Sequence, residues 1–492
     1  MAARPVNPII PGFAPDPSIV LVDDTFFLVN STFHVFPGLP IFASKDLVDW
    51  NQIDTNGDVM LATGGLYAPT IRYHHGTFYV VCTNIIHPEG ESRDISENFI
   101  VSSTDIWADA WSDPVYFEFK GIDPSIIFDE DGRSYMHGSA APGPMTKIHL
   151  FEIDLKTGKK LSDEKKIWDG TGGIYPEGPH LYKRDGWFYL LISEGGTHEG
   201  HMITVARSTD IWGPYESFSS NPILTAKGTD EYIRYTGHCD MFQDKKGDWW
   251  GVCLGVRKEE GGRFVMGRET FITPGTWAEG EWPTLELVKS NPKGLSVQDQ
   301  SSRITAKPFV DFVYIRDADL SNYTISDEGT DITLKPSGID LSHPTNSPTF
   351  IGKRQRTLEG ASTVIVSGLN QSSQVKAGLA CYKDEHRYIR IFYDTLGGAI
   401  IFEERNNAKK IHKTTKQELK IGDSLALRLE YTERAYRLSY RSSAEETAAW
   451  QTLASVDTMD LTDPDFVGPI MGIFALAEDQ SAEVRFQDLE ID

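Results

Sequence analysis

Three carboxylates and a histidine recur at matching places in a repeated pattern along this chain. The pattern is a short turn followed by an aromatic strand. Its aromatic anchors stand 52 to 61 residues apart and are Phe27, Tyr79, Tyr135, Tyr189 and Trp250. Eleven or twelve residues before each anchor stands one further residue, in order Asp16, Tyr67, Asp123, Glu177 and His238. If the repeats are arranged radially, these five side chains face one central axis.

Carboxyl groups that share a small site cannot all ionise freely, because like charges raise one another's pKa. Two carboxyls in different surroundings can then divide into a proton donor and a proton acceptor. In glycosidic bond cleavage one such group protonates the leaving oxygen, and the other activates water or attacks the sugar. Glu177 stands just before the apolar run of DGWFYLLIS, where desolvation favours the protonated form that a general acid needs.

The same residues also have structural interpretations. Asp16 in APDPS and Asp123 in GIDPS could cap turns, since Asp-Pro is common turn chemistry. His238 in GHCD could be a hydrogen-bonded core histidine. The DPS triplet nevertheless recurs at two equivalent offsets, and Glu177 in PEGPH stands at a third. This recurrence favours the catalytic interpretation.

Two aromatic residues are similarly ambiguous. Tyr67 and Phe33 could be core aromatics, or they could stack on the apolar face of a pyranose or furanose ring. The place of His238 in the ring favours a role near the axis, holding water or an ion. One histidine with carboxylates nearby is too weak a signal for a catalytic metal.

The elements that must position these residues are strands. Helical periodicity is nearly absent, and short alternating or aromatic runs are broken by Gly, Asp and Pro. Repeats of roughly 50 residues built from about four strands are typical of propeller blades. We therefore expect an all-β chain in which residues 1–290 form a five-bladed β-propeller.

The pattern changes after a polar segment at 291–307, which we interpret as a linker. In residues 308–492, alternating apolar runs at 425–431 and 436–440 predict a β-hairpin. Further strands are expected at 363–366, 388–393, 399–402, 470–476 and 484–491. Antiparallel strands without helices predict a jelly-roll-like β-sandwich for this second domain.

The bulk composition excludes several classes of partner. The 492 residues carry a formal net charge of −24, which argues against nucleic acid and anionic membrane surfaces. No apolar run is long enough to predict a transmembrane helix. The start of the chain lacks an apolar signal core. We expect a secreted protein whose signal has been removed, with a cytoplasmic protein as the alternative. The four cysteines form no CxxC pair and are expected to be buried free thiols.

The segments around the ring resemble glycoside hydrolase family 43. The resemblance spans about residues 7–290 and is carried by NPIIPGFAPDPSIV, GGLYAPTIRYHHGTFYVVCTN, GIDPSIIFDEDG, YPEGPHLYKRDGWFYLLISEGGT, GHCDMFQDKKGDWW and MGRETFITP. The region after about residue 305, including PTFIGKRQR, resembles the C-terminal β-sandwich attached to some members. Members of the family include β-xylosidases and α-L-arabinofuranosidases.

The resemblance implies an inverting mechanism on a five-bladed propeller. Asp16 would be the general base that activates water, and Glu177 would be the general acid. Asp123 would orient Glu177 and tune its pKa. The side chains expected to bind substrate are Phe33, Tyr67, His238 and Arg268. An inverting arrangement predicts that the carboxyls of Asp16 and Glu177 lie about 6.5–9.5 Å apart.

The implied mechanism requires no cofactor. Some family members hold a calcium ion at the axis, and His238 would lie near such a structural calcium. Many family β-xylosidases carry Trp-Ala-Pro where this chain has Tyr67-Ala68-Pro69.

The difference at Tyr67 favours release of α-L-arabinofuranose side chains from arabinoxylan or arabinoxylo-oligosaccharides, including the O-3 arabinose of doubly substituted xylose. A β-xylosidase acting on xylo-oligosaccharides and a non-catalytic carbohydrate-binding protein are the alternatives. The sequence does not give the oligomeric state.

Overall fold

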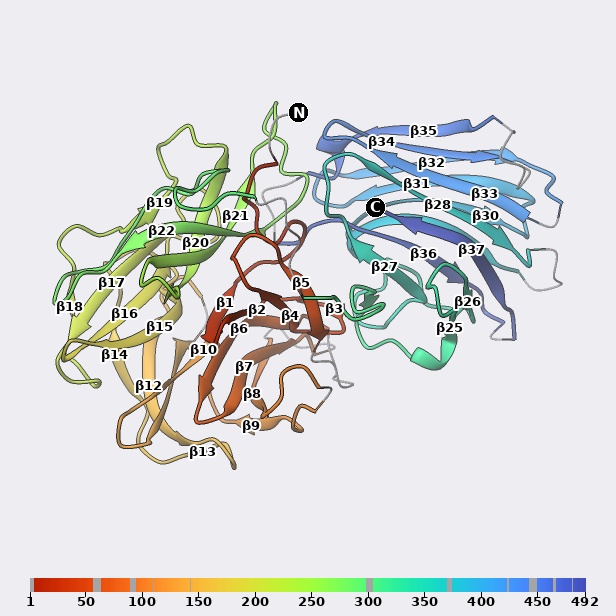
Figure 1. The fold of residues 1–492 in the computed structure, drawn as a ribbon. Helices are drawn as coiled ribbons and strands as arrows, with labels where there is room; N and C mark the ends of the chain where they lie inside the picture. The colour runs from red at the N-terminus through yellow and green to blue at the C-terminus, as the bar shows by residue number, and fades with distance from the viewer. Residues whose placement is uncertain are drawn as a thin grey trace. The chain divides into compact units, whose positions relative to one another are not determined.

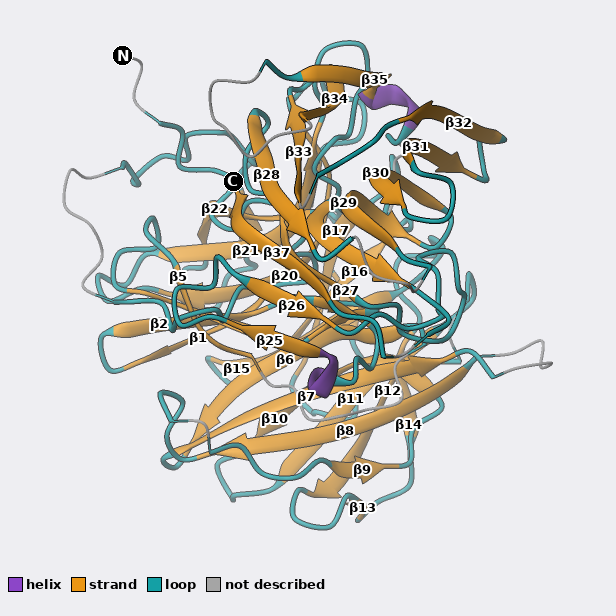
Figure 2. Ribbon diagram, turned by 90° about the vertical axis from the view of Figure 1, so that its right-hand side faces the viewer, coloured by secondary structure: helices purple, strands orange, loops and turns teal. Residues whose placement is uncertain are grey.

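The chain folds into two units of β-strands in a computed structural model, which describes residues 4–55, 63–88, 94–108, 110–141, 143–297, 304–369, 374–422, 424–441, 449–462, 466–479 and 481–492. The first unit comprises Met1–Arg257 and Arg268–Val310, and the second comprises Lys258–Gly267 and Asp311–Asp492. The described residues contain no α-helix, as expected for an all-β protein, and the short helical segments drawn purple in Figure 2 are 3-10 helices. In this part of the chain, no helix is long and apolar enough to cross a membrane.

The first unit is a five-bladed β-propeller with one antiparallel sheet in each blade (Figure 1). The first blade contains β1 (Ser18–Val22), β2 (Thr25–Val29), β4 (Pro40–Ser44) and β5 (Asn51–Thr55), with the short β3 (Val35–Phe36) between β2 and β4. The second contains β6 (Gly65–His74), β7 (Thr77–Ile86), β8 (Ile95–Ser103) and β9 (Val115–Phe117). The third contains β10 (Gly121–Phe128), β11 (Ser134–Ala140), β12 (Lys147–Asp154), β13 (Lys159–Lys160) and β14 (Lys165–Trp168).

The last two blades follow the same plan. The fourth contains β15 (Glu177–Arg184), β16 (Trp187–Glu194), β17 (Met202–Ser208), β18 (Glu216–Ser217) and β19 (Leu224–Thr225). The fifth contains β20 (Ile233–Gln243), β21 (Trp249–Arg257), β22 (Glu269–Thr276) and β23 (Thr284–Leu285). The first strands of the blades adjoin one another in a closed ring, in the order β1, β6, β10, β15, β20 and back to β1.

The repeated aromatic anchors fill the interfaces between blades. Each anchor lies in, or packs against, a different hydrophobic cluster that joins two neighbouring blades. In the first interface, Phe27 of β2 packs edge-on against Phe78 of β7, with ring centroids 5.3 Å apart. The recurrence of large aromatic side chains at this position therefore reflects equivalent packing in each blade.

The N-terminal segment closes the propeller by binding the last blade. The side-chain amide of Asn7 donates to the carbonyls of Ile272 and Lys289, both at 2.7 Å, and its Oδ1 accepts from the Ile272 amide at 2.9 Å. Ile10 forms a β-bridge with Thr270 of β22. The chain start is thereby tied to the end of the fifth blade, which brings Asp16 beside residues that lie 250 positions later.

The second unit is a β-sandwich of two antiparallel sheets (Figure 1, teal to blue). One sheet contains β25 (Tyr323–Ile325), β26 (Ile332–Leu334), β37 (Val484–Ile491), β28 (Gly360–Ser367), β33 (Ser424–Tyr431), β34 (Ala435–Arg441) and β35 (Gln451–Asp457). The other contains β27 (Phe350–Arg354), β36 (Ile470–Leu476), β29 (Lys376–Asp384), β30 (Arg387–Asp394), β31 (Ala399–Asn406) and β32 (Ile411–Glu418). The remaining elements are β24 (Tyr314–Ile315) and the 3-10 helices η1 (Leu320–Asn322) and η2 (Thr458–Asp460).

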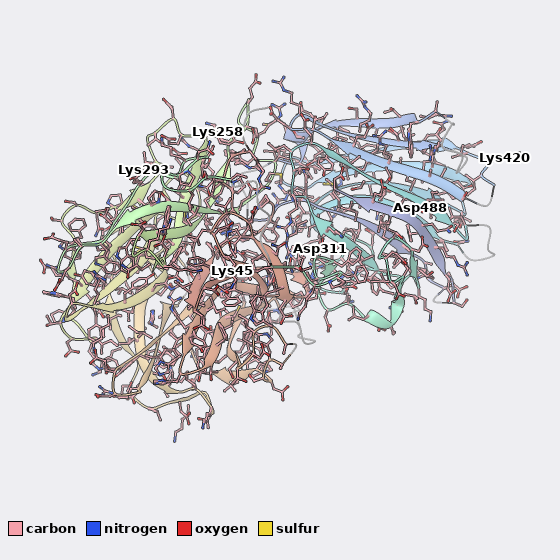
Figure 3. All side chains as sticks on the ribbon, in the orientation of Figure 1. Lys45, Lys258, Lys293, Asp311, Lys420 and Asp488 are labelled. Atoms are coloured by element: carbon pink, nitrogen blue, oxygen red, sulfur yellow. The ribbon has the colours of Figure 1, made fainter. Side chains whose placement is uncertain are left out.

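The strands predicted for the sandwich are confirmed, and the predicted hairpin is the antiparallel pair β33 and β34. Their alternating Leu and Tyr side chains enter a core shared by both sheets. The charged side chains of Lys420 and Asp488 lie outside the core of the sandwich. Those of Lys45 and Lys293 lie on the outside of the propeller (Figure 3). All four cysteines are buried free thiols, as expected.

One segment of the predicted propeller range is grouped with the sandwich. Lys258–Gly267, between β21 and β22, belongs to the second unit, where Arg263 binds Asp457 at 3.0 Å and Thr458 at 3.1 Å. The predicted linker at 291–307 is grouped with the first unit, which continues to Val310, although residues 298–303 lie outside the described part.

Candidate active site

The candidate catalytic residues lie at interruptions of the innermost strands. The pairing register of β6, β10, β15 and β20 with the next strand shifts at Tyr67/Thr70, Ile122/Ser125, Glu177/His180 and Gly237/Cys239. Each blade has one residue with positive φ at this level: Asp16 (52°), Ala68 (40°), Asp123 (54°), Gly178 (56°) and His238 (45°). Such bulges bend a strand and re-aim its side chains, which here brings polar groups to the axis.

The positive-φ residues show which positions of the five blades correspond in the structure, and they do so more accurately than the spacing to the anchors in the sequence. In every blade, the residue paired with the aromatic anchor stands four positions after the positive-φ residue; the paired residues are Val20, Arg72, Ile127, Tyr182 and Phe242. Ala68 and Gly178 are the structural equivalents of Asp16, so Tyr67 and Glu177 stand one position earlier. The sequence spacing does not show this difference, because the first hairpin of the third and fifth blades is one residue longer.

Asp16 is buried among groups that favour its ionised form. Its Oδ2 accepts a hydrogen bond from the Ser31 hydroxyl at 2.6 Å, and its Oδ1 accepts from Arg268 Nη1 at 3.3 Å. His238 Nδ1 lies 3.7 Å from the same oxygen. Burial by itself raises the pKa of Asp16, but Arg268, His238 and Ser31 together hold that pKa below its usual value. Asp16 is therefore suited to accept a proton.

Glu177 is affected in the opposite direction. Burial raises its pKa well above the usual value, and the neighbouring carboxyls of Asp123 and Asp16 add to the effect. Among the described residues, the Glu177 carboxyl has no hydrogen bond or ion pair, and the charge of Arg268 opposes the shift without reversing it. A carboxyl with a raised pKa is suited to donate a proton.

Asp123 contacts the backbone next to Glu177. Its Oδ2 accepts the amide of Gly178 at 2.9 Å, so it fixes the bulge from which Glu177 projects. Burial raises the pKa of Asp123, and the charge of Asp16 adds to this shift. The role of orienting and tuning Glu177 stays a prediction.

The predicted substrate-binding aromatics form one wall beside Asp16. The rings of Phe33 and Tyr67 lie 4.3 Å apart between centroids, and the Arg268 guanidinium lies 5.2 Å from the centroid of Phe33. Arg268 also donates to Thr197 Oγ1 at 3.3 Å. Of the four predicted binding residues, Arg268 and His238 thus contact the Asp16 carboxylate, whereas Phe33 packs against Arg268 and Tyr67 packs against Phe33.

The residues around His238 do not fit the implied calcium ion. Its backbone amide donates to Ser193 Oγ at 2.6 Å, and its ring packs against Gly178. Calcium takes about six to eight oxygen ligands. Within the described ranges, no group of three or more His, Cys, Asp or Glu side chains is placed to hold a metal. The contacts of His238 are instead with Asp16 and with the His180 ring, whose centroid lies 6.5 Å away.

Sequence reasoning missed the residues that hold Asp16 in place. Buried Asn30 donates to the carbonyls of Ala14 and Pro15, both at 3.0 Å, and to Thr270 Oγ1 at 2.8 Å. The next residue, Ser31, binds Asp16 directly. A hydroxyl residue stands four positions after the anchor in four of the five repeats (Ser31, Thr83, Ser139 and Ser193), and this recurrence could have marked Ser31, whereas Asn30 has no counterpart of its type. His201 also lies near this site, and burial lowers its pKa to about 4.

A carboxyl with a lowered pKa and a second with a raised pKa, close together at the axis of a five-bladed propeller, are typical of a glycoside hydrolase. Residues 5–283 match the family model described as Glycosyl hydrolases family 43, and residues 306–491 match the Beta xylosidase C-terminal Concanavalin A-like domain. The chain belongs to glycosyl hydrolase family 43.

Similar proteins cover nearly the whole chain. A non-reducing end alpha-L-arabinofuranosidase, BoGH43B of Bacteroides ovatus, is 33% identical over 96% of this chain and 92% of its own length. A putative beta-xylosidase of Escherichia coli is 28% identical over 94% of this chain and 93% of its own. A solved structure described as Bacteroides ovatus Xyloglucan PUL GH43B is 31% identical, with a TM-score of 0.86 and 99% coverage of both chains.

Proposed function

We propose that this enzyme is an inverting, exo-acting α-L-arabinofuranosidase that releases arabinofuranose side chains from arabinoxylan or arabinoxylo-oligosaccharides. The observation that carries the proposal is the opposite direction of the pKa shifts of Asp16 and Glu177 at one propeller axis. A relative of 33% identity carries the same activity in its name. The oxygen-3 arabinose of doubly substituted xylose is the side chain that we assign as the preferred target.

In this mechanism the Asp16 carboxylate removes a proton from a water molecule. The water oxygen attacks the anomeric carbon from the face opposite the leaving group, and Glu177 gives its proton to the glycosidic oxygen as that bond breaks. The sugar leaves with inverted configuration, while Asp16 ends protonated and Glu177 ends ionised. Proton exchange with solvent restores both groups.

A groove beside the candidate site supports a branched polymer as substrate. Tyr67 is one of the residues that line this groove, which has a volume of about 1050 Å³. The ends of β7, β8, β9 and β10 in the second and third blades also line it. Half-exposed Tyr116 and Ile95 give it apolar surface, and Asp94, Glu97 and Lys120 give it polar groups. An enzyme that removes side chains needs room for the backbone that carries them, and this groove supplies such room.

β-Xylosidase activity is the second candidate, and two comparisons favour it. The C-terminal region matches a domain described from beta xylosidases, and several relatives bear that name. Paired assays with p-nitrophenyl α-L-arabinofuranoside and p-nitrophenyl β-D-xyloside decide between the two activities. We expect kcat/KM to be at least tenfold higher for the arabinofuranoside; a preference for the xyloside would establish the alternative.

The polymer and the stereochemistry are tested separately. Arabinoxylo-oligosaccharides of defined branching should lose arabinose, the doubly substituted unit first, whereas arabinose release only from xyloglucan fragments would replace the assigned polymer. Proton NMR of the first released sugar should show the inverted anomer, and a retained anomer would exclude this mechanism. Sugar binding without any hydrolysis would establish a non-catalytic binding protein.

A further inference from the structure

A second ring of polar residues lies below the candidate catalytic ring. In each blade it is formed by the residue two positions after the positive-φ residue; the members are Ser18, Thr70, Ser125, His180 and Asp240. Side chains two positions apart on a strand share a face, and the step along the strand is about 6.6 Å. The ring therefore lies one layer deeper along the axis, and the proposed reaction does not use it.

Arg72 of β6 connects three other blades across this layer. Its Nη1 donates to Ser18 Oγ at 3.1 Å and to Asp240 Oδ2 at 2.7 Å. Its Nη2 contacts His180 Nδ1 at 3.1 Å and donates to Asp240 Oδ1 at 3.2 Å. Ser125 of the third blade completes the network, with its Oγ 3.0 Å from the same His180 nitrogen. One guanidinium thus links the innermost strands β1, β6, β15 and β20.

Asp240, the one acidic member of this ring, has both oxygens fully engaged. Besides Arg72, Oδ1 accepts from Tyr182 Oη at 2.7 Å, while Oδ2 accepts from Ser18 Oγ at 2.7 Å and from the Ile19 amide at 3.2 Å. Its side chain is 2% exposed. A bidentate arginine and three further donors fill the acceptor capacity of a carboxylate.

The neutral imidazole of His180 accepts a hydrogen bond from Arg72. Burial lowers its pKa to about 3, so the ring is neutral at ordinary pH. Its Nδ1 faces the guanidinium, which has only donors, so Nδ1 is the acceptor and the ring proton is on Nε2. The layer therefore holds one cation, one anion and a neutral imidazole.

We propose that the guanidinium of Arg72 is the resident cation of the propeller axis, so that the axis below the catalytic ring is held together without a metal ion. A calcium ion placed here would meet a fixed positive charge and a carboxylate with no oxygen lone pair to spare. A calcium ion therefore does not fit this layer, and the side chain of Arg72 links its strands instead. This assignment does not depend on the sugar that the enzyme releases.

The first test measures metal dependence of the native enzyme. After treatment with a chelator and dialysis, we expect elemental analysis to find less than about 0.1 calcium per chain. We also expect a thermal unfolding midpoint that changes by less than about 1 °C on addition of millimolar calcium chloride, because nothing in this layer is left to bind it. Stoichiometric calcium, or a midpoint that falls with the chelator and recovers with calcium, would overturn the proposal.

The second test removes the cation. Arg72→Gln leaves Asp240 buried without its counter-charge and should lower the unfolding midpoint by about 10 °C. Arg72→Lys keeps the positive charge but cannot bind both oxygens of Asp240 at once. Its unfolding midpoint should lie between those of Arg72→Gln and the native enzyme. The double variant Arg72→Gln/Asp240→Asn removes both charges and should be more stable than Arg72→Gln alone, which keeps the proposal testable even if the single variant does not fold.

The matched control is Arg133→Gln, which breaks a surface pair with Asp129 at 2.9 Å. It should shift the midpoint by no more than about 2 °C, because exposed ion pairs contribute little. Equal shifts for Arg72→Gln and Arg133→Gln would contradict the proposal. So would a double variant no more stable than the single one, since the buried charge would then not be the cause of the loss.

Discussion

At the scale of single residues, the neighbours of two carboxyls move their pKa values in opposite directions. Asp16 is buried and Glu177 is partly exposed, and desolvation by itself raises the pKa of both. Arg268 and Ser31 contact the Asp16 carboxylate, whereas the described residues offer Glu177 mainly the negative charge of Asp123. The pKa values of the two groups move apart in consequence, which lets one be ionised while the other is protonated.

Replacing Glu177 with Gln should change the pH profile in a specific way. In the native enzyme, kcat/KM should fall at low pH as Asp16 takes up a proton and at higher pH as Glu177 loses one. Because the pKa of Glu177 is raised, the active range should extend well above the usual range of a glutamate. Glu177→Gln should lower kcat/KM on arabinoxylo-oligosaccharides by about 10²–10⁴-fold and abolish the alkaline limb.

The leaving group provides the control for Glu177→Gln. p-Nitrophenolate leaves without a proton, so the aryl glycoside should lose less activity than the oligosaccharide. Asp16→Asn removes the base and should impair both substrates alike. An alkaline limb that persists in Glu177→Gln would assign the general acid to another residue.

At the scale of elements, the bulges in the innermost strands decide where these side chains point. A regular strand would direct alternate residues to the two faces of the sheet. The positive-φ residue in each blade breaks that alternation, and in the fourth blade it is Gly178. Glycine fits here for two reasons: its φ is 56°, and an added Cβ would lie 2.9 Å from His238 Nδ1.

Gly178→Ala should therefore reduce activity more than stability. The new methyl group would push the His238 ring away from Asp16 and shift the bulge that carries Glu177. A displacement of about 1 Å at such a site costs roughly 100-fold in rate, so we expect kcat to fall by about that factor. Steady-state kinetics together with urea unfolding would separate the two effects.

Gly186→Ala is the matched control for this prediction. Gly186 also has a positive φ of 78°, but it lies in the hairpin between β15 and β16 with open space around its Cβ direction. It should lose about 1 kcal/mol of unfolding free energy and keep the native kcat. If both variants keep the native kcat, the bulge does not place the catalytic groups.

At the scale of the whole molecule, the propeller places distant residues together only when its ring is closed. The closing contacts are those of the N-terminal segment on β22, next to Arg268. The Ala14 amide donates to the Arg268 carbonyl at 3.1 Å, two residues before Asp16. Asp16 and the arginine that lowers its pKa therefore meet at the seam of the ring.

Asn7→Ala should weaken this seam. It removes three hydrogen bonds from a buried amide and leaves their backbone partners unpaired, which should lower the unfolding free energy by about 2–4 kcal/mol. Asn291→Ala removes one hydrogen bond of 3.3 Å to Val6 in the same seam and should cost less than about 1 kcal/mol. Equal losses, measured by urea unfolding, would mean that the Asn7 contacts do not close the ring.

The sequence alone determined the fold class, the blade anchors and the sandwich strands. Anchors such as Phe27 and Trp250 recur because each fills an equivalent interface between blades. Equivalent packing requires a large aromatic side chain at the same position of each repeat, so it can be recognised in the sequence. The alternation of apolar and polar residues in β33 and β34 likewise indicates that one face of each strand is buried. The sequence also suggested that Asp16, Asp123 and Glu177 converge, because their motifs stand at similar offsets.

Only the tertiary structure decided which groups surround those carboxyls. Asn30 and Arg72 have no counterpart of the same residue type in the other blades and act through contacts between segments far apart in the chain. The placement of Lys258–Gly267 with the second unit is likewise a matter of long-range packing. The periodicity of a sequence indicates which face of a strand is buried. The pKa of a carboxyl such as Asp16 depends instead on charges and hydrogen-bond donors from other blades, which lie beside it only once the ring has closed.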